Sequence, residues 1–306
     1  MEKVSILHLI TAAKNASPFD VNMAFDAGFE KIMPYTQVEL KEVGALVQDA
    51  IFSRSPSGIK RESIFIGGRD IDVAMDMLEA ARKAMVPPFA VSVFADPSGA
   101  FTTAAAMLAK VEQQLVKHFG CEAGQALQGQ KIAIFGATGP VAGCVAVIAA
   151  KNGAAVQLVA HRSLSDVQAK ASAYNTRYGV NIGYVDGTSE EYKQKVLHES
   201  HVVLCAAAAG VQVISLAQMA GSSTLKVVAD VNAVPPTGAE GVEVTADGVA
   251  VDGTSAYGIG ALAIGRVKYE TQHALLNQML SSDGPVYLDF MAAFAVARQI
   301  AGIPNY

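Results

Sequence analysis

The segment from Lys131 to Gly143 constrains the fold more than any other part of the chain. Lys-Ile-Ala-Ile-Phe predicts a buried strand, and a tight turn leads directly into a helix. Turn and helix start are formed by Gly136, Ala137, Thr138, Gly139, Pro140 and Val141. The spacing from Ala137 to Ala142 is a variant of G-x-G-x-x-G/A, in which small residues let the backbone approach a pyrophosphate. We therefore expect a dinucleotide phosphate at the helix N-terminus, where free N–H groups and a partial positive charge meet it and Pro140 is well tolerated.

Strands and helices alternate along the chain from this segment onward. Predicted strands cover residues 131–135, 155–160, 182–185, 201–205 and 225–231, and predicted helices cover 141–152, 163–178, 189–199 and a short piece near Leu216. Helices of this length between strands give right-handed crossovers and a parallel sheet. The pattern predicts an α/β fold with a Rossmann-type nucleotide domain.

Polar residues at the ends of these strands indicate the kind of nucleotide. After the second strand, where an NAD site usually carries an acidic residue, stand His161, Arg162 and Ser163. Their hydrogen-bond donors suit the 2′-phosphate of NADP, although a solvated arginine at a helix start is the alternative and NAD is not excluded. At the same sheet edge we assign Ala207, Asp230 and Asn232 to the cofactor site, because ligands bind at the carboxyl ends of parallel strands.

The residues before Lys131 read as a smaller α/β domain. Its predicted strands cover 4–10, 63–66 and 89–95, and its helices cover 20–27, 38–52, 71–85 and 102–119. A chain of 306 residues fits two domains at roughly 150 residues each. We expect a substrate domain at 1–120, completed by a C-terminal helical segment at 283–306, and a nucleotide domain at 121–282, with a cleft between them. A further helix is predicted from Arg266 to about Leu280.

Composition and charge exclude several classes of protein. The chain is 51% apolar and 17% charged with a net charge of −5, which argues against disorder and against binding to nucleic acid or an acidic membrane surface. No apolar run reaches the ~20 residues of a membrane helix, and the first residues lack a secretory pattern, so we expect a cytoplasmic protein. Three cysteines and six histidines show no metal-ligand spacing, so no metal site is expected.

Several segments together resemble the NAD(P)-dependent methylene-tetrahydromethanopterin dehydrogenases of one-carbon-metabolising bacteria. The segments are 17–20 (SPFD), 64–70 (IFIGGRD), 96–106 (DPSGAFTTAAA), 139–141 (GPV), 228–236 (VADVNAVPP) and 257–268 (YGIGALAIGRVK). The resemblance implies a two-domain oxidoreductase, related in architecture to the methylene-tetrahydrofolate dehydrogenases, with the pterin between the domains. One departure is that Ala137 and Ala142 stand where relatives carry glycine, which leaves the preference between NADP and NAD open.

The resemblance also implies a reaction and residues for it. A hydride would pass from the methylene carbon of the pterin, tetrahydromethanopterin or tetrahydrofolate, to the nicotinamide. Lys268 matches a lysine of the family pattern and is our candidate for the catalytic centre, as a positioning group; an exposed helix lysine is the alternative. Substrate contacts are assigned to Phe19, Asp20, Asp96, Thr102 and Thr103. For the two aspartates and the two threonines, a helix or turn cap is the competing interpretation. We further expect a homo-oligomer, to which the apolar C-terminal helix would contribute unless it packs on the first domain.

The sequence leaves two rival functions open. The Phe-Gly-Ala-Thr-Gly turn also resembles the opening of short-chain reductases, but about 130 residues precede it here. A non-catalytic NADP(H) sensor would use the same nucleotide domain without turnover and would not need Lys268.

Overall fold

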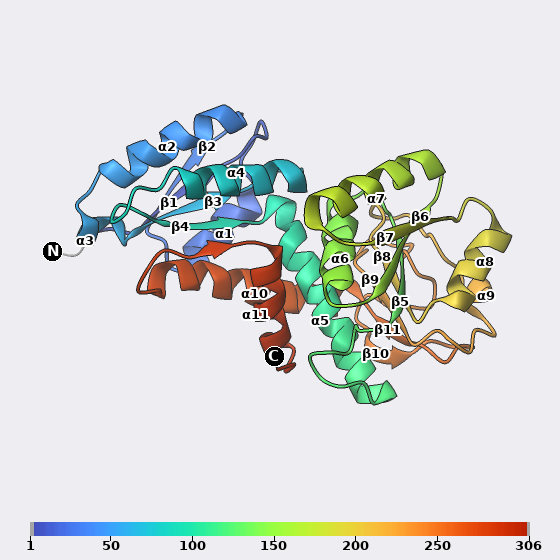
Figure 1. Cartoon of the computed structure of the whole chain (residues 1–306). Coiled ribbons are helices and arrows are strands. Elements are labelled where there is room, and N and C mark those ends of the chain that lie inside the picture. Colours follow the sequence, from blue (N-terminus) through green and yellow to red (C-terminus); the bar gives the residue numbers. More distant parts are fainter. Residues whose placement is uncertain (1–2, 305–306) are drawn as a thin grey trace. The chain divides into compact units, whose positions relative to one another are not determined.

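The computed structural model describes residues 3–304, and the chain folds into two compact units (Figure 1). The first unit comprises the chain up to Thr102 together with Tyr269–Val296, and the second comprises Thr103–Lys268 and the residues from Ala297 on. The sequence predicted a division near residue 120 instead. Helix α5 (Ala100–Phe119) belongs almost wholly to the second unit, because its buried polar residues pair there: Glu112 binds Arg298, and Lys110 binds Asp247.

A five-stranded, fully parallel sheet forms the centre of the first unit. Its strands, in spatial order, are β12 (Tyr287–Leu288), β4 (Ser92–Ala95), β3 (Glu62–Ile66), β1 (Ile6–Ile10) and β2 (Lys31–Tyr35). Every residue of β3 and β4 is buried, as expected for central strands covered on both faces. Strand β2 was not predicted, because it is an exposed edge strand whose sequence Lys-Ile-Met-Pro-Tyr includes a proline.

Helices flank this sheet. They are α1 (Pro18–Asp26), α2 (Leu40–Phe52), the single turn α3 (Pro56–Ile59) and α4 (Ile71–Lys83). Local chemistry sets their starts: Ser17 accepts a hydrogen bond from the Asp20 N–H before α1, and Asp70 caps α4. Figure 1 shows α2 and α4 along one face of the sheet, where they pack against each other.

The second unit contains a seven-stranded sheet. Its order is β10 (Asp247–Ala250), β11 (Tyr257–Ile259), β9 (Val227–Asp230), β8 (Val202–Cys205), β5 (Lys131–Phe135), β6 (Ala155–Ala160) and β7 (Ile182–Asp186). Only β10 in this sheet runs antiparallel to its neighbour. Counted from β5 along the chain, the six parallel strands have the order 3-2-1-4-5-6 of a Rossmann fold, and the predicted α/β class is confirmed. The order reverses between β5 and β8, where such sheets bind ligands.

Seven helices and one short 3-10 turn complete the described chain after β4. They are the turn η1 (Pro97–Gly99), then α5, α6 (Pro140–Lys151), α7 (Leu164–Tyr178), α8 (Glu190–Glu199), α9 (Leu216–Met219), α10 (Ala261–Ser281) and α11 (Phe290–Ile300). Helix α10 begins five residues before the predicted start at Arg266, because Ala-Leu-Ala-Ile after Gly260 favours a helix and Gly265 is tolerated within it. Within residues 3–304, no helix has the length and hydropathy needed to cross a bilayer.

Candidate nucleotide and substrate sites

The turn after β5 brings two backbone segments of the second unit into close approach. Gly136 has a φ of +84°, a conformation that side chains rarely adopt. A β-carbon there would lie 2.6 Å from the nitrogen of Ala207, in the turn that follows β8. Only glycine fits between these turns, so β5 and β8 can end side by side at the point where the strand order reverses.

Helix α6 begins at this turn with its first amides uncovered. Gly139 is the N-cap residue and Pro140 the first helical residue, and no side chain caps the helix. The Gly139 N–H donates to the Gly136 carbonyl at 2.9 Å, which closes the turn. Ala142 is fully buried, so the helix packs tightly on the sheet. Free N–H groups and the helix dipole make this end suitable for a phosphate.

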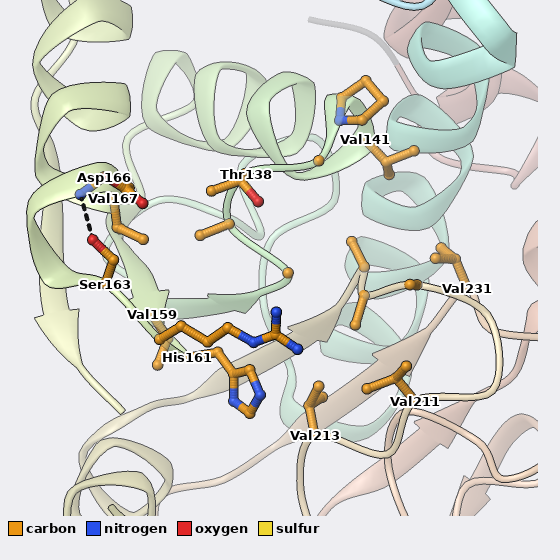
Figure 2. A pocket seen from close by; sticks show the side chains of 18 residues that line it. Thr138, Val141, Val159, His161, Ser163, Asp166, Val167, Val211, Val213 and Val231 are labelled. Carbon is orange, nitrogen blue, oxygen red and sulfur yellow. Dashed lines mark hydrogen bonds between the residues drawn. The ribbon is translucent and has the colours of Figure 1, made fainter. Parts of the chain in front are cut away.

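A cavity of about 680 Å³ lies in front of this helix end, within the second unit. It is lined by Gly136, Ala137, Thr138, Gly139, Pro140, Val141, Val159, His161, Arg162, Ser163, Asp166, Val167, Ala206, Ala207, Ala208, Val211, Val213 and Val231. Figure 2 shows Thr138 and Val141 on one wall, Ser163 and Asp166 on a second, and Val211, Val213 and Val231 on a third. The cavity is large enough for much of a dinucleotide, and its walls are mainly apolar with polar groups at one end.

The polar end of the cavity is formed by the residues that follow strand β6 in the chain. His161 and Arg162 are exposed there, and Ser163 caps α7 by accepting the Asp166 N–H at 3.2 Å. Arg162 has no hydrogen bond or ion pair with any residue between 3 and 304, so its guanidinium donors are available to a ligand. All the residues that the sequence predicted to bind the nucleotide line this cavity, except Asp230 and Asn232.

Asp230 and Asn232 hold a loop rather than line the cavity. The Asp230 carboxylate is 1% exposed and accepts the N–H groups of Asn232 at 2.9 Å and Ala239 at 3.0 Å. Asn232 accepts from Gly210 and Val234 and donates to the carbonyl of Pro236. Burial raises the pKa of Asp230 above its usual value, against the lowering effect of these backbone donors. Val231 between them lines the cavity, and a direct nucleotide contact for Asp230 or Asn232 stays a prediction.

Several lining residues were not predicted. They are Val159, Asp166, Val167, Ala206, Ala208, Val211, Val213 and Val231. Strand ends signalled some of them, since Ala206 follows β8 and Val231 follows β9 at the same sheet edge. Val211 and Val213 come from the irregular segment after β8, whose path is set by bonds such as Val213 N–H to Gly238 carbonyl. No local pattern in the sequence indicates that path.

The first unit gathers polar groups at the carboxyl edge of its own sheet. Asp20, in the first turn of α1, is 4% exposed, and the side-chain amide of Gln272 donates to it at 3.4 Å. A β-carbon on Gly67, which follows β3, would lie 3.6 Å from Asp20 Oδ2 and 3.8 Å from Thr11. The Asp20 carboxylate therefore lies beside the turn that follows β3.

Asp96 and Thr102 bind each other within the same unit. Both are fully buried; Asp96 accepts the N–H groups of Phe101 at 2.9 Å and Thr102 at 3.2 Å, and the Thr102 hydroxyl donates to it at 2.6 Å. Helix α5 begins at Ala100 and not at Thr102 as predicted, so these bonds form its first turn. Asp96 thus caps the first turn of α5, and the Thr102 hydroxyl holds the Asp96 carboxylate in place. Substrate contact by either residue stays a prediction.

The remaining predicted substrate residues lie in more open positions. Phe19 is 46% exposed at the start of α1, and Thr103 is half-buried on α5. Lys268 is half-buried in α10, two turns inside the helix, which corrects its predicted place at a helix start. Within residues 3–304, no three His, Cys, Asp or Glu side chains gather in a way that would hold a metal ion.

Comparison with known proteins identifies relatives along most of the chain. A family model described as methylene-tetrahydromethanopterin dehydrogenase, N-terminal, matches residues 18–98. The NAD(P)-dependent methylenetetrahydromethanopterin dehydrogenase of Methylorubrum extorquens is 46% identical over 97% of this chain and 99% of its own length. The bifunctional protein MdtA of the same organism is 32% identical over 93% of this chain and 95% of its own.

Solved structures with little sequence similarity share the fold. The ligand-free 5-ketofructose reductase of Gluconobacter sp. strain CHM43 aligns with a TM-score of 0.51 at 15% identity, over 97% of this chain and 99% of its own. A sequence identity of 15% supports only a shared architecture. The 46% identical relative, in contrast, aligns with both units of the chain. The chain belongs to the NAD(P)-dependent methylene-tetrahydromethanopterin dehydrogenase family, as its sequence motifs predicted.

Proposed function

We propose that this protein oxidises methylene-tetrahydromethanopterin to the methenyl form and transfers the hydride to NADP⁺, or to NAD⁺. One observation carries the proposal: the Gly136 turn and the uncapped end of α6 open into a cavity whose polar end carries Arg162. The relative of Methylorubrum extorquens, whose name states this activity, matches the chain over nearly its full length.

The residues of the cavity fit a phosphorylated dinucleotide. Gly136 and Gly139 allow backbone and pyrophosphate to approach, and the amides of Val141 and Ala142 are the free donors of the helix end. Arg162 and Ser163 offer donors for a 2′-phosphate, and the valines opposite suit flat rings. When bound, the nicotinamide supplies the hydride acceptor.

The protein's own residues have mainly a positioning task in this reaction. The two nitrogens that flank the methylene carbon already supply the electrons that stabilise the product, so no strong general base is required. The buried Asp20 carboxylate beside the Gly67 turn is a hydrogen-bond acceptor that suits the amino and ring N–H donors of a pterin. We assign Phe19 to the pterin ring, Lys268 to positioning of the substrate, and Thr103 to a weaker contact. Asp96 and Thr102 fix the start of α5 in the first unit.

Three further properties belong to the proposal. We infer a cytoplasmic protein, because its reduced nucleotide and pterin are metabolites of that compartment. We also infer that it forms a homo-oligomer and does not bind nucleic acid, in keeping with a net charge of −5.

A spectrophotometric assay tests the proposal. Purified protein is mixed with NADP⁺ or NAD⁺ and with methylene-tetrahydromethanopterin or methylene-tetrahydrofolate in a two-by-two design, and nicotinamide reduction is followed. We expect turnover with the first pterin, faster with NADP⁺. Nucleotide binding without turnover on either pterin would favour the sensor, and turnover on a simple carbonyl substrate alone would reject the assignment.

A further inference from the structure

The nucleotide cavity carries a carboxylate on the same wall as Arg162 and Ser163. Asp166 lies in the first turn of α7, and its backbone N–H donates to the Ser163 hydroxyl at 3.2 Å. Figure 2 shows Asp166 beside Ser163, on the wall that faces Thr138. An acid is therefore built into the end of the cavity that follows β6, where a Rossmann fold receives the ribose of the adenosine half.

The Asp166 carboxylate is not neutralised by the protein. Its side chain is exposed and, among residues 3–304, has neither a hydrogen bond nor an ion pair. Arg162 is likewise unpaired, so the wall presents one positive and one negative group separately to a ligand. Ser163 already accepts the Asp166 N–H and lies 3.0 Å from the hydroxyl of Ser165.

These two charges act differently on the two forms of the cofactor. A 2′-phosphate, with nearly two negative charges, is attracted by Arg162 but repelled by Asp166. A free ribose 2′-hydroxyl is not repelled, and a carboxylate at this place accepts its hydrogen bond.

We propose that Asp166 is a specificity-determining residue of the nucleotide site: its negative charge offsets part of the attraction of Arg162 for a 2′-phosphate and keeps NAD(H) competitive with NADP(H). The inference rests on the proposed function, because it requires a nicotinamide dinucleotide in this cavity. The inference extends the proposed function, because it assigns opposite effects on the choice between NADP(H) and NAD(H) to Arg162 and Asp166.

If Asp166 had only a structural role, its substitution would have a different effect. An exposed acidic residue in the first turn of a helix slightly stabilises that helix through the macrodipole. Loss of that effect would lower stability slightly and change both nucleotides alike. Only a ligand contact changes their ratio.

Direct binding measurements separate these possibilities. Dissociation constants for NADPH and NADH are measured by fluorescence titration on wild type, Asp166→Asn and Asp166→Lys. Glu191→Lys is the control, because Glu191 is an exposed acid in the first turn of α8 that does not line the cavity. Circular dichroism verifies folding, and Asp166→Asn provides the nearly isosteric variant should Asp166→Lys not fold.

We expect Asp166→Asn to tighten NADPH binding by about fivefold and Asp166→Lys by about tenfold or more, with NADH unchanged or weakened. Glu191→Lys should leave the ratio of the two constants as in wild type. A ratio that stays constant in both Asp166 variants would overturn the inference while wild-type binding still supports the proposed function. Wild-type protein that binds neither nucleotide would instead overturn the proposed function itself.

Discussion

A β-carbon built on Gly136 would lie 2.5 Å from the carbonyl carbon of Ala206, inside the contact distance that any side chain requires. The two residues follow β5 and β8, the strands between which the order of the sheet reverses. Their close approach shapes the wall of the cavity, because both residues line it. Position 136 therefore requires glycine for two reasons: its positive φ and the lack of room for a β-carbon.

Gly136→Ala should damage both the fold of this turn and nucleotide binding. The positive φ and the overlap with Ala206 together should lower the free energy of unfolding by about 2 to 4 kcal/mol, measured by urea denaturation. NADPH affinity should fall by about tenfold or more. Gly221→Ala is the control, since its φ is +75° but its β-carbon would meet open space, and about 1 kcal/mol is expected there. Equal effects of the two variants would argue against a steric contact at Gly136.

Arg162→Glu should act on NADP far more than on NAD. Reversal of the charge replaces attraction to a 2′-phosphate by repulsion, so the Michaelis constant for NADP⁺ should rise by about tenfold or more. The constant for NAD⁺ should change little, and Arg162→Lys should give an intermediate value because it keeps the charge but loses the planar donor pair. Equal changes for both nucleotides would remove Arg162 from the 2′-phosphate site.

Lys268→Ala should affect the pterin side of the reaction and leave the nucleotide side intact. We expect turnover or pterin affinity to fall by about 10- to 100-fold, with the dissociation constant of NADPH within about twofold of wild type. Lys195→Ala, at an exposed position of α8, controls for loss of a surface lysine. Steady-state kinetics equal to wild type would show that Lys268 has no role in the reaction.

Asp230→Ala should unfold the loop that Asp230 closes. Removal of the carboxylate leaves the buried N–H groups of Asn232 and Ala239 without an acceptor, and a loss of about 2 to 4 kcal/mol in the free energy of unfolding is expected. Hydrogen exchange at residues 231–239 should speed up in parallel. A stable variant with protected amides but weakened nucleotide binding would show that Asp230 contacts the ligand directly instead.

His201 should make the stability of the protein depend on pH. Burial, Lys226 and Lys131 lower the pKa of His201 below its usual value, so the unfolded chain binds a proton more readily than the folded one. Stability should therefore fall as pH drops from just above the unfolded pKa of about 6.5 through the lowered folded value. Urea denaturation of wild type and His201→Gln between pH 8 and pH 5 measures this. The variant should lose less stability over that range, and parallel curves would contradict the expectation.

Much of the second unit could be predicted from the sequence alone. The strand–turn–helix at Lys131–Gly143, the strand ends at Arg162 and Ala207, and the βα alternation are local patterns of hydropathy and turn residues, and the structure places them as expected. The family could be recognised for a similar reason, since short motifs keep their order along the chain and the 46% identical relative confirms it.

Only the tertiary structure decided the rest. Whether an aspartate caps a helix, holds a loop or faces a ligand depends on the N–H groups that the folded chain brings to its carboxylate. The carboxylate of Asp96 accepts from the first turn of α5, and that of Asp230 accepts from Ala239. The side chain of Asp166 accepts from no N–H group within residues 3–304 and lines the cavity. The edge strand β2 and the allocation of α5 to the second unit likewise depend on contacts between segments far apart in the chain. Local propensity carries no information on such partners, because hydrogen bonds and burial are completed only when the chain has folded.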